Sequence, residues 1–388
     1  MKSYIFKMLM RLFNVPPVYS LAIGLIYYSS RAVFFLIGLK KKKTDNKKIL
    51  FVNYPRNKGD ALGGDTRINS IIINVLKEKG FDVEVYGKNG IPGTSYVIDI
   101  IDQFLGFQIG FTLNVSRHLH AANYYAVIID SSANFLVFYD RVINVFHYSY
   151  RQYAENVPGL SRDFKMIYRK MEKMQLYGAK KALNITVSRS LQNYLQARSS
   201  IYTTVIPNCV DTSVFYPDKK LKKKYPVAFI GGYAYYGKGM DIVEKLSNKN
   251  RTIHCFSNGS LNTKYLVNHS YLKQEDVPGI MNQVGILVYP SRSETFGLVP
   301  LEALACGVPI IMNKVGIGEE IIEVIPEFVV DAAGLSLDDI VREYDKRLTI
   351  IKNNYKVYSQ KSLSFIEEHG FTRERFARSW VDLIECEL

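Results

Sequence analysis

PSRSETFGLVPLEALACGVP, residues 290–309, determines how the second half of this chain is organised. It follows the apolar run GILVY, which predicts a buried strand, and Pro290 and Gly297 mark a turn. The apolar residues from Leu298 to Leu304 predict a helix that ends at Gly307. The sequence therefore predicts a strand, a loop, a helix and a further strand.

Two glutamates of this unit, Glu294 and Glu302, stand eight positions apart. We expect Glu294 in the loop and Glu302 in the first helical turn, so that both face one volume beside free N–H groups and the positive end of the helix dipole. Carboxylates accept hydrogen bonds from sugar hydroxyls, and amides can bind phosphates. A sugar joined to a diphosphate would supply hydroxyls to the carboxylates and phosphates to the amides. The alternative is that Glu302 complements the helix dipole and Glu294 caps a loop.

The block as a whole resembles the E-x7-E signature of retaining GT-B glycosyltransferases of the family-four type, the glycosyl transferases group 1. The likeness continues into GIGEEII at residues 316–322. It implies an α/β, GT-B fold with two Rossmann-like domains facing across a cleft, preceded here by an N-terminal membrane-associated helical segment. It also implies a hexosyltransferase that moves a sugar from a nucleotide-sugar donor with retention of configuration.

The resemblance implies donor-binding roles for several residues of this block. Glu302 would accept hydrogen bonds from the ribose hydroxyls, and Glu294 would accept them from the sugar. The amides of Phe296, Gly297 and Leu298 would meet phosphate and sugar oxygens.

Lys238, in the loop YAYYGKG, resembles the family lysine that reaches the donor diphosphate. A cation there would offset the charge that develops on the leaving group. A solvated surface lysine is the alternative. The family tends to carry an Arg five positions earlier, where this chain has Tyr233. This departure weakens the expected diphosphate site and leaves open a scaffold protein without strong activity.

The first half of the chain contains three further candidate site residues, two glycines and a histidine. Gly63 and Gly64 precede an expected helix at 66–79 and resemble the family's first glycine-rich loop, where the backbone approaches the donor phosphates or the acceptor. A plain turn is the alternative. His147 follows an expected strand at 141–146 and resembles the family histidine that lies near the reacting sugar. A lone histidine in such a place is more often structural.

The apolar and charged content of the 388 residues is that of an ordinary folded protein, and the length suggests two or three domains. We expect four segments: a membrane-associated segment at 1–46, an acceptor-side Rossmann-like domain at 47–205, a nucleotide-sugar Rossmann-like domain at 206–365, and a C-terminal helix at 366–388. The resemblance implies that this last helix, which contains Trp380, returns to the first domain.

The N-terminal segment concentrates the basic charge. Residues 1–50 hold ten Lys or Arg against one Asp, which accounts for nine of the net charge of +14. This excess beside an apolar run favours an anionic membrane surface over nucleic acid. A helix from Val18 to Leu39 would be about 33 Å long, enough to span a bilayer. Arg31 in its middle keeps open a helix that lies in the interface, and a buried structural helix is a third alternative.

Lys40 to Lys48 would stay cytoplasmic by the positive-inside tendency, which places the catalytic domains on the cytoplasmic side. No Asp-x-Asp motif occurs and the four cysteines lack metal-ligand spacing, so we expect no metal and no cofactor besides the nucleotide-sugar co-substrate. The expected partners are a UDP- or GDP-linked sugar, a lipid-linked glycan or glycolipid acceptor and a membrane surface, with no nucleic acid. The alternative function is a catalytically weak GT-B scaffold in a membrane glycan-assembly complex.

Overall fold

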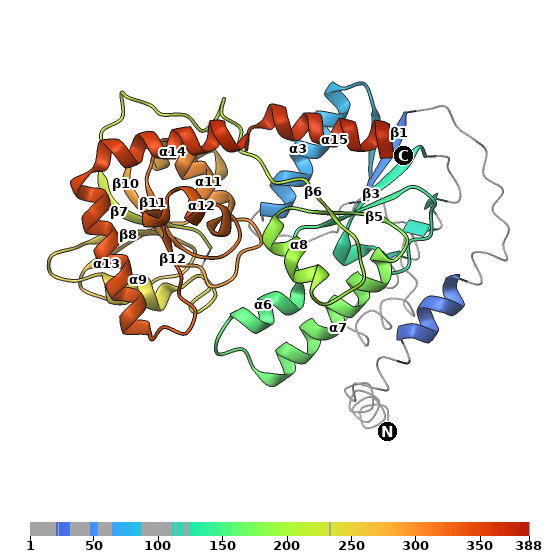
Figure 1. Cartoon of the computed structure of the whole chain (residues 1–388), viewed down its shortest axis with the longest axis horizontal. Helices are drawn as coiled ribbons and strands as arrows, with labels where there is room; N and C mark the ends of the chain where they lie inside the picture. Colours follow the sequence, from blue (N-terminus) through green and yellow to red (C-terminus); the bar gives the residue numbers. More distant parts are fainter. Residues whose placement is uncertain are drawn as a thin grey trace.

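The computed structural model describes residues 21, 23–31, 47–52, 64–86, 111–112, 115–116, 118–119, 124–232 and 234–387. These residues form two α/β domains that lie side by side (Figure 1). Each domain is built on a parallel sheet of six strands. The expected α/β class with two Rossmann-like domains is therefore confirmed.

The first sheet has the strand order β2-β1-β3-β4-β5-β6. Every residue of its central strands β3 and β4 is buried, and both strands are rich in Val and Ile. Such continuous apolar strands are typical of parallel sheets whose two faces are covered. The strands are β1 (Lys48–Val52), β2 (Asp82–Tyr86), β3 (Ala126–Asp130), β4 (Val142–Phe146), β5 (Leu183–Thr186) and β6 (Thr204–Val205).

Serine residues start three helices of the first domain. The hydroxyls of Ser149, Ser161 and Ser188 each accept a backbone N–H from the first turn that follows. The helices are α3 (Gly64–Glu78), α6 (Tyr150–Asn156), α7 (Arg162–Ala179) and α8 (Arg189–Gln196), with the 3-10 turn η2 (Ser131–Ala133). The sequence prediction for α3 was wrong at its start, because the helix begins at Gly64. The carboxylate of Asp65 lies in its first turn and complements the helix dipole there.

The second sheet has the strand order β12-β11-β10-β7-β8-β9 and is also parallel. The order reverses between β7 and β10, which makes this the switch point of the sheet. Open α/β sheets bind ligands at the carboxyl ends of the strands at such a point. The strands are β7 (Tyr225–Ile230), β8 (Ile253–Phe256), β9 (Leu266–His269), β10 (Val284–Tyr289), β11 (Ile310–Asn313) and β12 (Val329–Val330).

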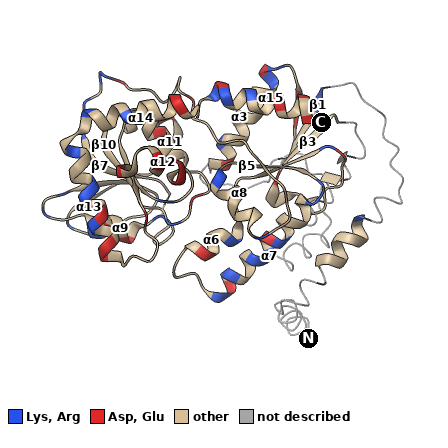
Figure 2. Ribbon diagram, in the orientation of Figure 1, with Lys and Arg blue, Asp and Glu red and all other residues tan. Residues whose placement is uncertain are grey.

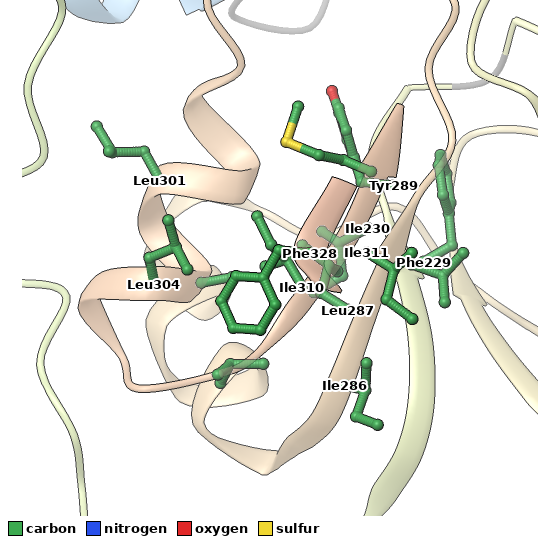
Figure 3. Close-up of a cluster of buried hydrophobic side chains, with 14 of the residues drawn as sticks. Phe229, Ile230, Ile286, Leu287, Tyr289, Leu301, Leu304, Ile310, Ile311 and Phe328 are labelled. Atoms are coloured by element: carbon green, nitrogen blue, oxygen red, sulfur yellow. The ribbon is translucent and has the colours of Figure 1, made fainter. Parts of the chain in front are cut away.

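The helices of the second domain pack on this sheet. Leu301 and Leu304 of α11 lie beside the side chains of the central strands in one buried cluster (Figure 3). The elements are α9 (Met240–Leu246), η3 (Gln274–Asp276), α10 (Val277–Gln283), α11 (Leu298–Ala305), α12 (Gly318–Val324), η4 (Pro326–Phe328), α13 (Leu337–Asn353) and α14 (Tyr355–His369).

The last helix, α15 (Arg373–Glu387), leaves the second domain and packs on α3 of the first (Figure 1). It contributes four residues to the buried cluster of the first domain: Phe376, Trp380, Leu383 and Ile384. The chain also crosses between the domains at Val210, whose N–H donates to the carbonyl oxygen of Phe371 at 2.9 Å. The two crossings therefore run next to each other.

Two glycines allow the loops around the switch point to approach each other. Gly239 has a φ of 69°, and a Cβ at this position would collide with the carbonyl oxygen of Pro290. Gly316 has a φ of 56°, and a Cβ there would collide with the carbonyl oxygen of Phe296. Only glycine combines a left-handed backbone with so little space. The loops after β7, β10 and β11 therefore lie in contact.

The N-terminal segment is described at residues 21 and 23–31, which are helical. Ile23 and Tyr27 are buried against the first domain, and the ring centroid of Tyr27 lies 5.1 Å from that of Tyr177 on α7. No helix within the described ranges is both long and apolar enough to cross a bilayer. The other parts of the expected membrane segment, residues 1–20, 22 and 32–46, lie outside the described residues.

Replacing Ile384 by alanine should destabilise the first domain, because this side chain of α15 is fully buried there. We expect a loss of about 2–5 kcal/mol in the free energy of unfolding. Urea unfolding followed by the fluorescence of Trp380, the single tryptophan, would measure it. Asp382→Ala, on the exposed side of the same helix, should change stability by less than about 0.5 kcal/mol. Equal effects of the two variants would contradict the packing of α15.

Gly316→Ala should destabilise the protein more than Gly334→Ala does. Both glycines have a positive φ, of 56° and 72°, so both substitutions carry a backbone penalty of about 1–2 kcal/mol. Only at Gly316 does the added methyl group collide with another loop, whereas nothing lies within 4 Å of the corresponding position at Gly334. Thermal unfolding of the two variants would compare them. Equal melting temperatures would show that the contact between the loops does not matter.

Candidate functional site

Lys238 and Glu294 lie together at the switch point of the second sheet. Lys238 is in the turn before α9, and Glu294 is in the loop after β10. Lys238 Nζ donates to Glu294 Oε1 at 2.5 Å and to the Tyr289 hydroxyl at 3.2 Å. The Tyr289 hydroxyl donates to the same carboxylate oxygen at 2.9 Å and points away from the apolar cluster that holds its ring (Figure 3). The three polar groups therefore form one compact unit.

The charges in this unit are fixed by its surroundings. Burial alone would lower the pKa of Lys238, but the attraction of Glu294 and the hydrogen bonds outweigh it and raise that pKa above its ordinary value. Burial and the charge of Glu294 raise the pKa of Tyr289. At neutral pH Lys238 is therefore an ammonium and Tyr289 a neutral phenol.

Side chains from the surrounding elements hold the loop that carries Glu294. The Ser291 hydroxyl donates to the carbonyl oxygen of Gly237 at 3.1 Å. The Arg292 guanidinium binds both carboxylate oxygens of Asp241 on α9, at 2.7 and 2.6 Å. Because these bonds join this loop to the turn that carries Lys238, they fix the position of Glu294 relative to the lysine.

Glu302 lies in α11, and its side chain is 2% exposed. The prediction that it lies in the first turn was wrong, because the helix begins at Leu298 and Glu302 opens the second turn. Its carboxylate pairs with the guanidinium of Arg67, which comes from α3 of the other domain. Apart from this ion pair, neither carboxylate oxygen has a hydrogen-bond partner in the part of the chain that the structure describes.

The start of α11 offers backbone amides to a ligand. The first helical bond joins the N–H of Leu301 to the carbonyl oxygen of Gly297, whose φ of 103° turns the chain into the helix. The amides of Leu298 and Val299 open the helix and therefore have no acceptor within it, and Pro300 has no N–H. The Phe296 side chain is buried in the core and its carbonyl oxygen accepts from Ile317, so only its amide could contact a ligand.

His147 lies at the carboxyl end of β4, between the two domains. Its ring is 5% exposed, and Nε2 lies 2.8 Å from Asn69 Oδ1 on α3. Because an amide oxygen only accepts, this bond assigns the proton to Nε2 and leaves Nδ1 as an acceptor in the neutral ring. Its carbonyl oxygen accepts from the Thr295 hydroxyl at 2.6 Å, next to Glu294. The structure thus brings His147 close to the loop of the second domain that carries the motif.

Further hydrogen bonds join the domains beside His147. Ser188 donates its hydroxyl to the carbonyl oxygen of Thr295 at 2.5 Å, and the Ser190 hydroxyl donates to Glu319 at 2.7 Å. Gly64 also lies at this boundary, since a Cβ there would be 3.0 Å from a methyl carbon of Leu298. The role of Gly64 that this geometry supports is close packing between domains.

Two of the predicted site residues cannot be placed. Gly63 and Tyr233 lie outside the described residues. The other predicted residues fall into one region at the facing edges of the two sheets: His147, Lys238, Glu294, Phe296, Gly297, Leu298, Glu302 and Gly64. Their roles in binding and catalysis stay predictions.

Sequence reasoning missed Arg67, Asn69, Asp130 and Tyr289. Asp130 had a signal that could have found it, because it is a carboxylate at the end of an otherwise apolar strand. Asn69 lies in an amphipathic helix that holds several other polar residues, so the sequence did not single it out. Burial raises the pKa of Asp130, although His147 and the bonds from Ser132 act against this rise. Arg67 and Tyr289 gave no such signal, since their roles depend on contacts with residues far away in the sequence.

Among the described residues, no group of three or more His, Cys, Asp or Glu side chains could hold a metal ion. The expectation that the protein needs no metal stays a prediction.

Comparison with known proteins relates the second domain to a protein family. Residues 219–357 match the family model of the glycosyl transferases group 1. Among curated proteins, the gpi3 subunit of phosphatidylinositol N-acetylglucosaminyltransferase from Schizosaccharomyces pombe is 25% identical over 201 residues, 47% of this chain and 41% of that protein. A protein named "Probable sucrose-phosphate synthase" from Thermosipho melanesiensis is 24% identical over 266 residues, 62% of this chain and 59% of that protein. The chain thus spans about half the length of these relatives.

Solved structures share the fold over most of the chain. Sucrose-phosphate synthase from Thermosynechococcus elongatus has a TM-score of 0.70 at 14% identity, covering 87% of this chain and 98% of that one. WaaG, a glycosyltransferase involved in lipopolysaccharide biosynthesis, has a TM-score of 0.66 at 15% identity, covering 87% and 99%. Anabaena Alr3699/HepE in complex with UDP and glucose has a TM-score of 0.61 at 14% identity, again covering 87% and 99%.

The resemblance drawn from the E-x7-E block is confirmed by these matches. This chain has the GT-B fold, and residues 219–357 match the model of the glycosyl transferases group 1.

Proposed function

We propose that this protein is a retaining, metal-independent glycosyltransferase that moves a sugar from a UDP- or GDP-linked donor to a membrane lipid-linked glycan or glycolipid. One observation carries the proposal. Both glutamates of the E-x7-E motif lie beside the switch point of the second sheet, and each is paired with a cation, Lys238 or Arg67. A nucleotide sugar supplies hydroxyls for the carboxylates and a diphosphate for the cations and amides.

The donor would lie along the second domain. The ribose hydroxyls would reach Glu302, which is buried and, apart from its ion pair with Arg67, has no hydrogen-bond partner among the described residues. The diphosphate would lie near Lys238 and the amides that open α11, and the sugar would reach Glu294. The UDP and glucose bound by the structurally similar Alr3699/HepE support this class of ligand.

The chemistry that this placement supports is charge stabilisation. Lys238 stays protonated beside Glu294, so a fixed positive charge is available when the bond between the sugar and the diphosphate breaks. The oxocarbenium-like sugar would then be attacked by the acceptor on the same face. His147, held by Asn69, would lie over the sugar from the first domain. Retention follows if the acceptor enters on the side where the diphosphate departs.

An apolar and basic surface on the first domain supports a lipid acceptor and a cytoplasmic, membrane-associated location. Phe164, Ile167, Met171 and Met174 recur at helical spacing and form one stripe on α7. The part with Met171 and Met174 packs with the cluster that contains Ile23, whereas Phe164 and Ile167 are exposed.

The helical residues that pack with Met171 and Met174 carry further exposed apolar side chains, Leu21, Leu25 and Tyr28. Lys and Arg residues lie along α7 (Figure 2) and just after it: Arg162, Lys165, Arg169, Lys170, Lys173, Lys180 and Lys181. Apolar side chains flanked by cations match an anionic lipid surface. The similarity to a phosphatidylinositol N-acetylglucosaminyltransferase subunit supports the same acceptor class.

A second candidate is a catalytically weak GT-B protein that acts as a scaffold in a membrane glycan-assembly complex. Tyr233, which stands where the family tends to carry an Arg, is the observation that favours it. The two proposals differ in turnover and agree in their need for the membrane.

Glu294→Gln should lower the rate of nucleoside diphosphate release by about 100-fold or more, because it removes the carboxylate that pairs with Lys238. The assay would use a panel of UDP- and GDP-sugars with membrane lipid extract, with and without EDTA. Glu367→Gln, the same change at an exposed position of α14, is the control and should retain full activity. The scaffold proposal would replace ours if the folded native protein releases no diphosphate from any donor. A rate that EDTA abolishes would contradict metal independence.

A double substitution, Phe164→Ser with Ile167→Ser, should weaken binding to vesicles that contain phosphatidylglycerol by about tenfold or more, since each exposed side chain would otherwise bury apolar area in the lipid. Raising the salt concentration should also weaken the native protein's binding. Co-sedimentation would measure both effects. Val357→Ser, an equally exposed apolar site on α14, should leave binding unchanged. Identical binding of all three proteins would exclude α7 from the membrane contact.

A further inference from the structure

Arg67 contacts the motif of the second domain although it belongs to the first. It lies in the first turn of α3, and its guanidinium pairs with the carboxylate of Glu302 in α11. The side chains are 22% and 2% exposed, so the ion pair is largely shielded from water.

The ion pair with Arg67 compensates the buried charge of Glu302. Apart from this ion pair, neither oxygen of Glu302 has a hydrogen-bond partner among the described residues. Burial lowers the pKa of Arg67, but an arginine has so high a pKa that it stays charged. A buried carboxylate or guanidinium without a partner is strongly unfavourable, so each of the two groups needs the other unless a ligand replaces it.

A ligand that carries only hydroxyls cannot replace this ion pair well. The ribose hydroxyls could hydrogen-bond to Glu302, but they would displace Arg67 and leave its charge without a partner. A nucleoside diphosphate offers the hydroxyls to Glu302 and its phosphates to Arg67 at the same time, and charge-assisted bonds from a guanidinium to phosphate are strong. When such a ligand replaces the ion pair, the positive charge of Arg67 is again paired with an anion and Glu302 again has hydrogen-bond donors.

We infer that Arg67 is a specificity residue for the donor: it competes with the ribose for Glu302 in the free protein and binds the diphosphate in the complex. The inference rests on the proposed function, since it assumes that a nucleotide sugar occupies this site. Lys238 and Glu294 form the matching ion pair within the second domain. Arg67 differs from Lys238 because it makes recognition of the phosphates depend on the first domain.

The test is a comparison of Arg67→Gln with the native protein, using calorimetric titration with uridine, guanosine, UDP and GDP. We expect the two affinities to change in opposite directions. The nucleoside should bind more tightly, because its competitor for Glu302 is gone. The nucleoside diphosphate of the same base should bind about tenfold to 100-fold more weakly, because it loses a charge-assisted contact.

Arg141→Gln is the matched control, because this exposed arginine precedes β4 at the opposite end of the first sheet. It should leave both affinities unchanged. If Arg67→Gln changes both affinities by the same factor, Arg67 has a structural role only and the inference is overturned. If both affinities rise, Arg67 only blocks the site, which also overturns it. If the native protein binds UDP or GDP but Arg67→Gln leaves both affinities unchanged, the inference alone fails. If the native protein binds none of the four compounds, the proposed function fails and the inference fails with it.

Arg67→Gln leaves Glu302 buried without a partner, and the variant could unfold for that reason. The pair Glu302→Gln and Arg67→Gln/Glu302→Gln reduces this problem. In the single variant the unpaired group is Arg67, which is 22% exposed, and the double variant leaves no unpaired charge. Glu302→Gln should keep a preference for the diphosphate over the nucleoside, and the double variant should lose about tenfold or more of that preference. Equal preferences in the two proteins would overturn the inference.

Discussion

The carboxylate of Glu302 is buried at the boundary of the two domains, and a buried charge must be compensated. Its partner, Arg67, comes from the other domain, so this compensation exists only while the domains are in contact. The bonds from Ser188 and Thr295 accompany that contact. The contact between the domains therefore includes a buried carboxylate that needs a partner from the other domain.

The second requirement is the close approach of three loops at the switch point. Gly239 and Gly316 supply the backbone conformation and the space that this approach needs. As a result Lys238 and Glu294, from loops that follow different strands, share a short hydrogen bond. The parallel sheet behind them supplies the strand ends from which these loops start.

Much of the fold could be predicted from the sequence, because long apolar strands and helix boundaries are local patterns. The helix that begins at Leu298 and the loop position of Glu294 are examples. The start of α11 at Leu298 was predicted correctly, but Glu302 was assigned to the first turn although it is the fifth helical residue and lies just beyond that turn. Arg67 was missed altogether. Its partner is more than 200 positions away, and no local pattern encodes a contact between two domains.

The packing of α15 on the first domain affects how the chain can fold during synthesis. Phe376, Trp380, Leu383 and Ile384 complete the core around β1 and α3, yet the ribosome adds them only after the whole second domain. Part of the apolar core of the first domain therefore stays exposed to solvent while the second domain is translated. Until α15 emerges, that surface is available to chaperones or to neighbouring chains, and a product that stops before α15 would expose it permanently.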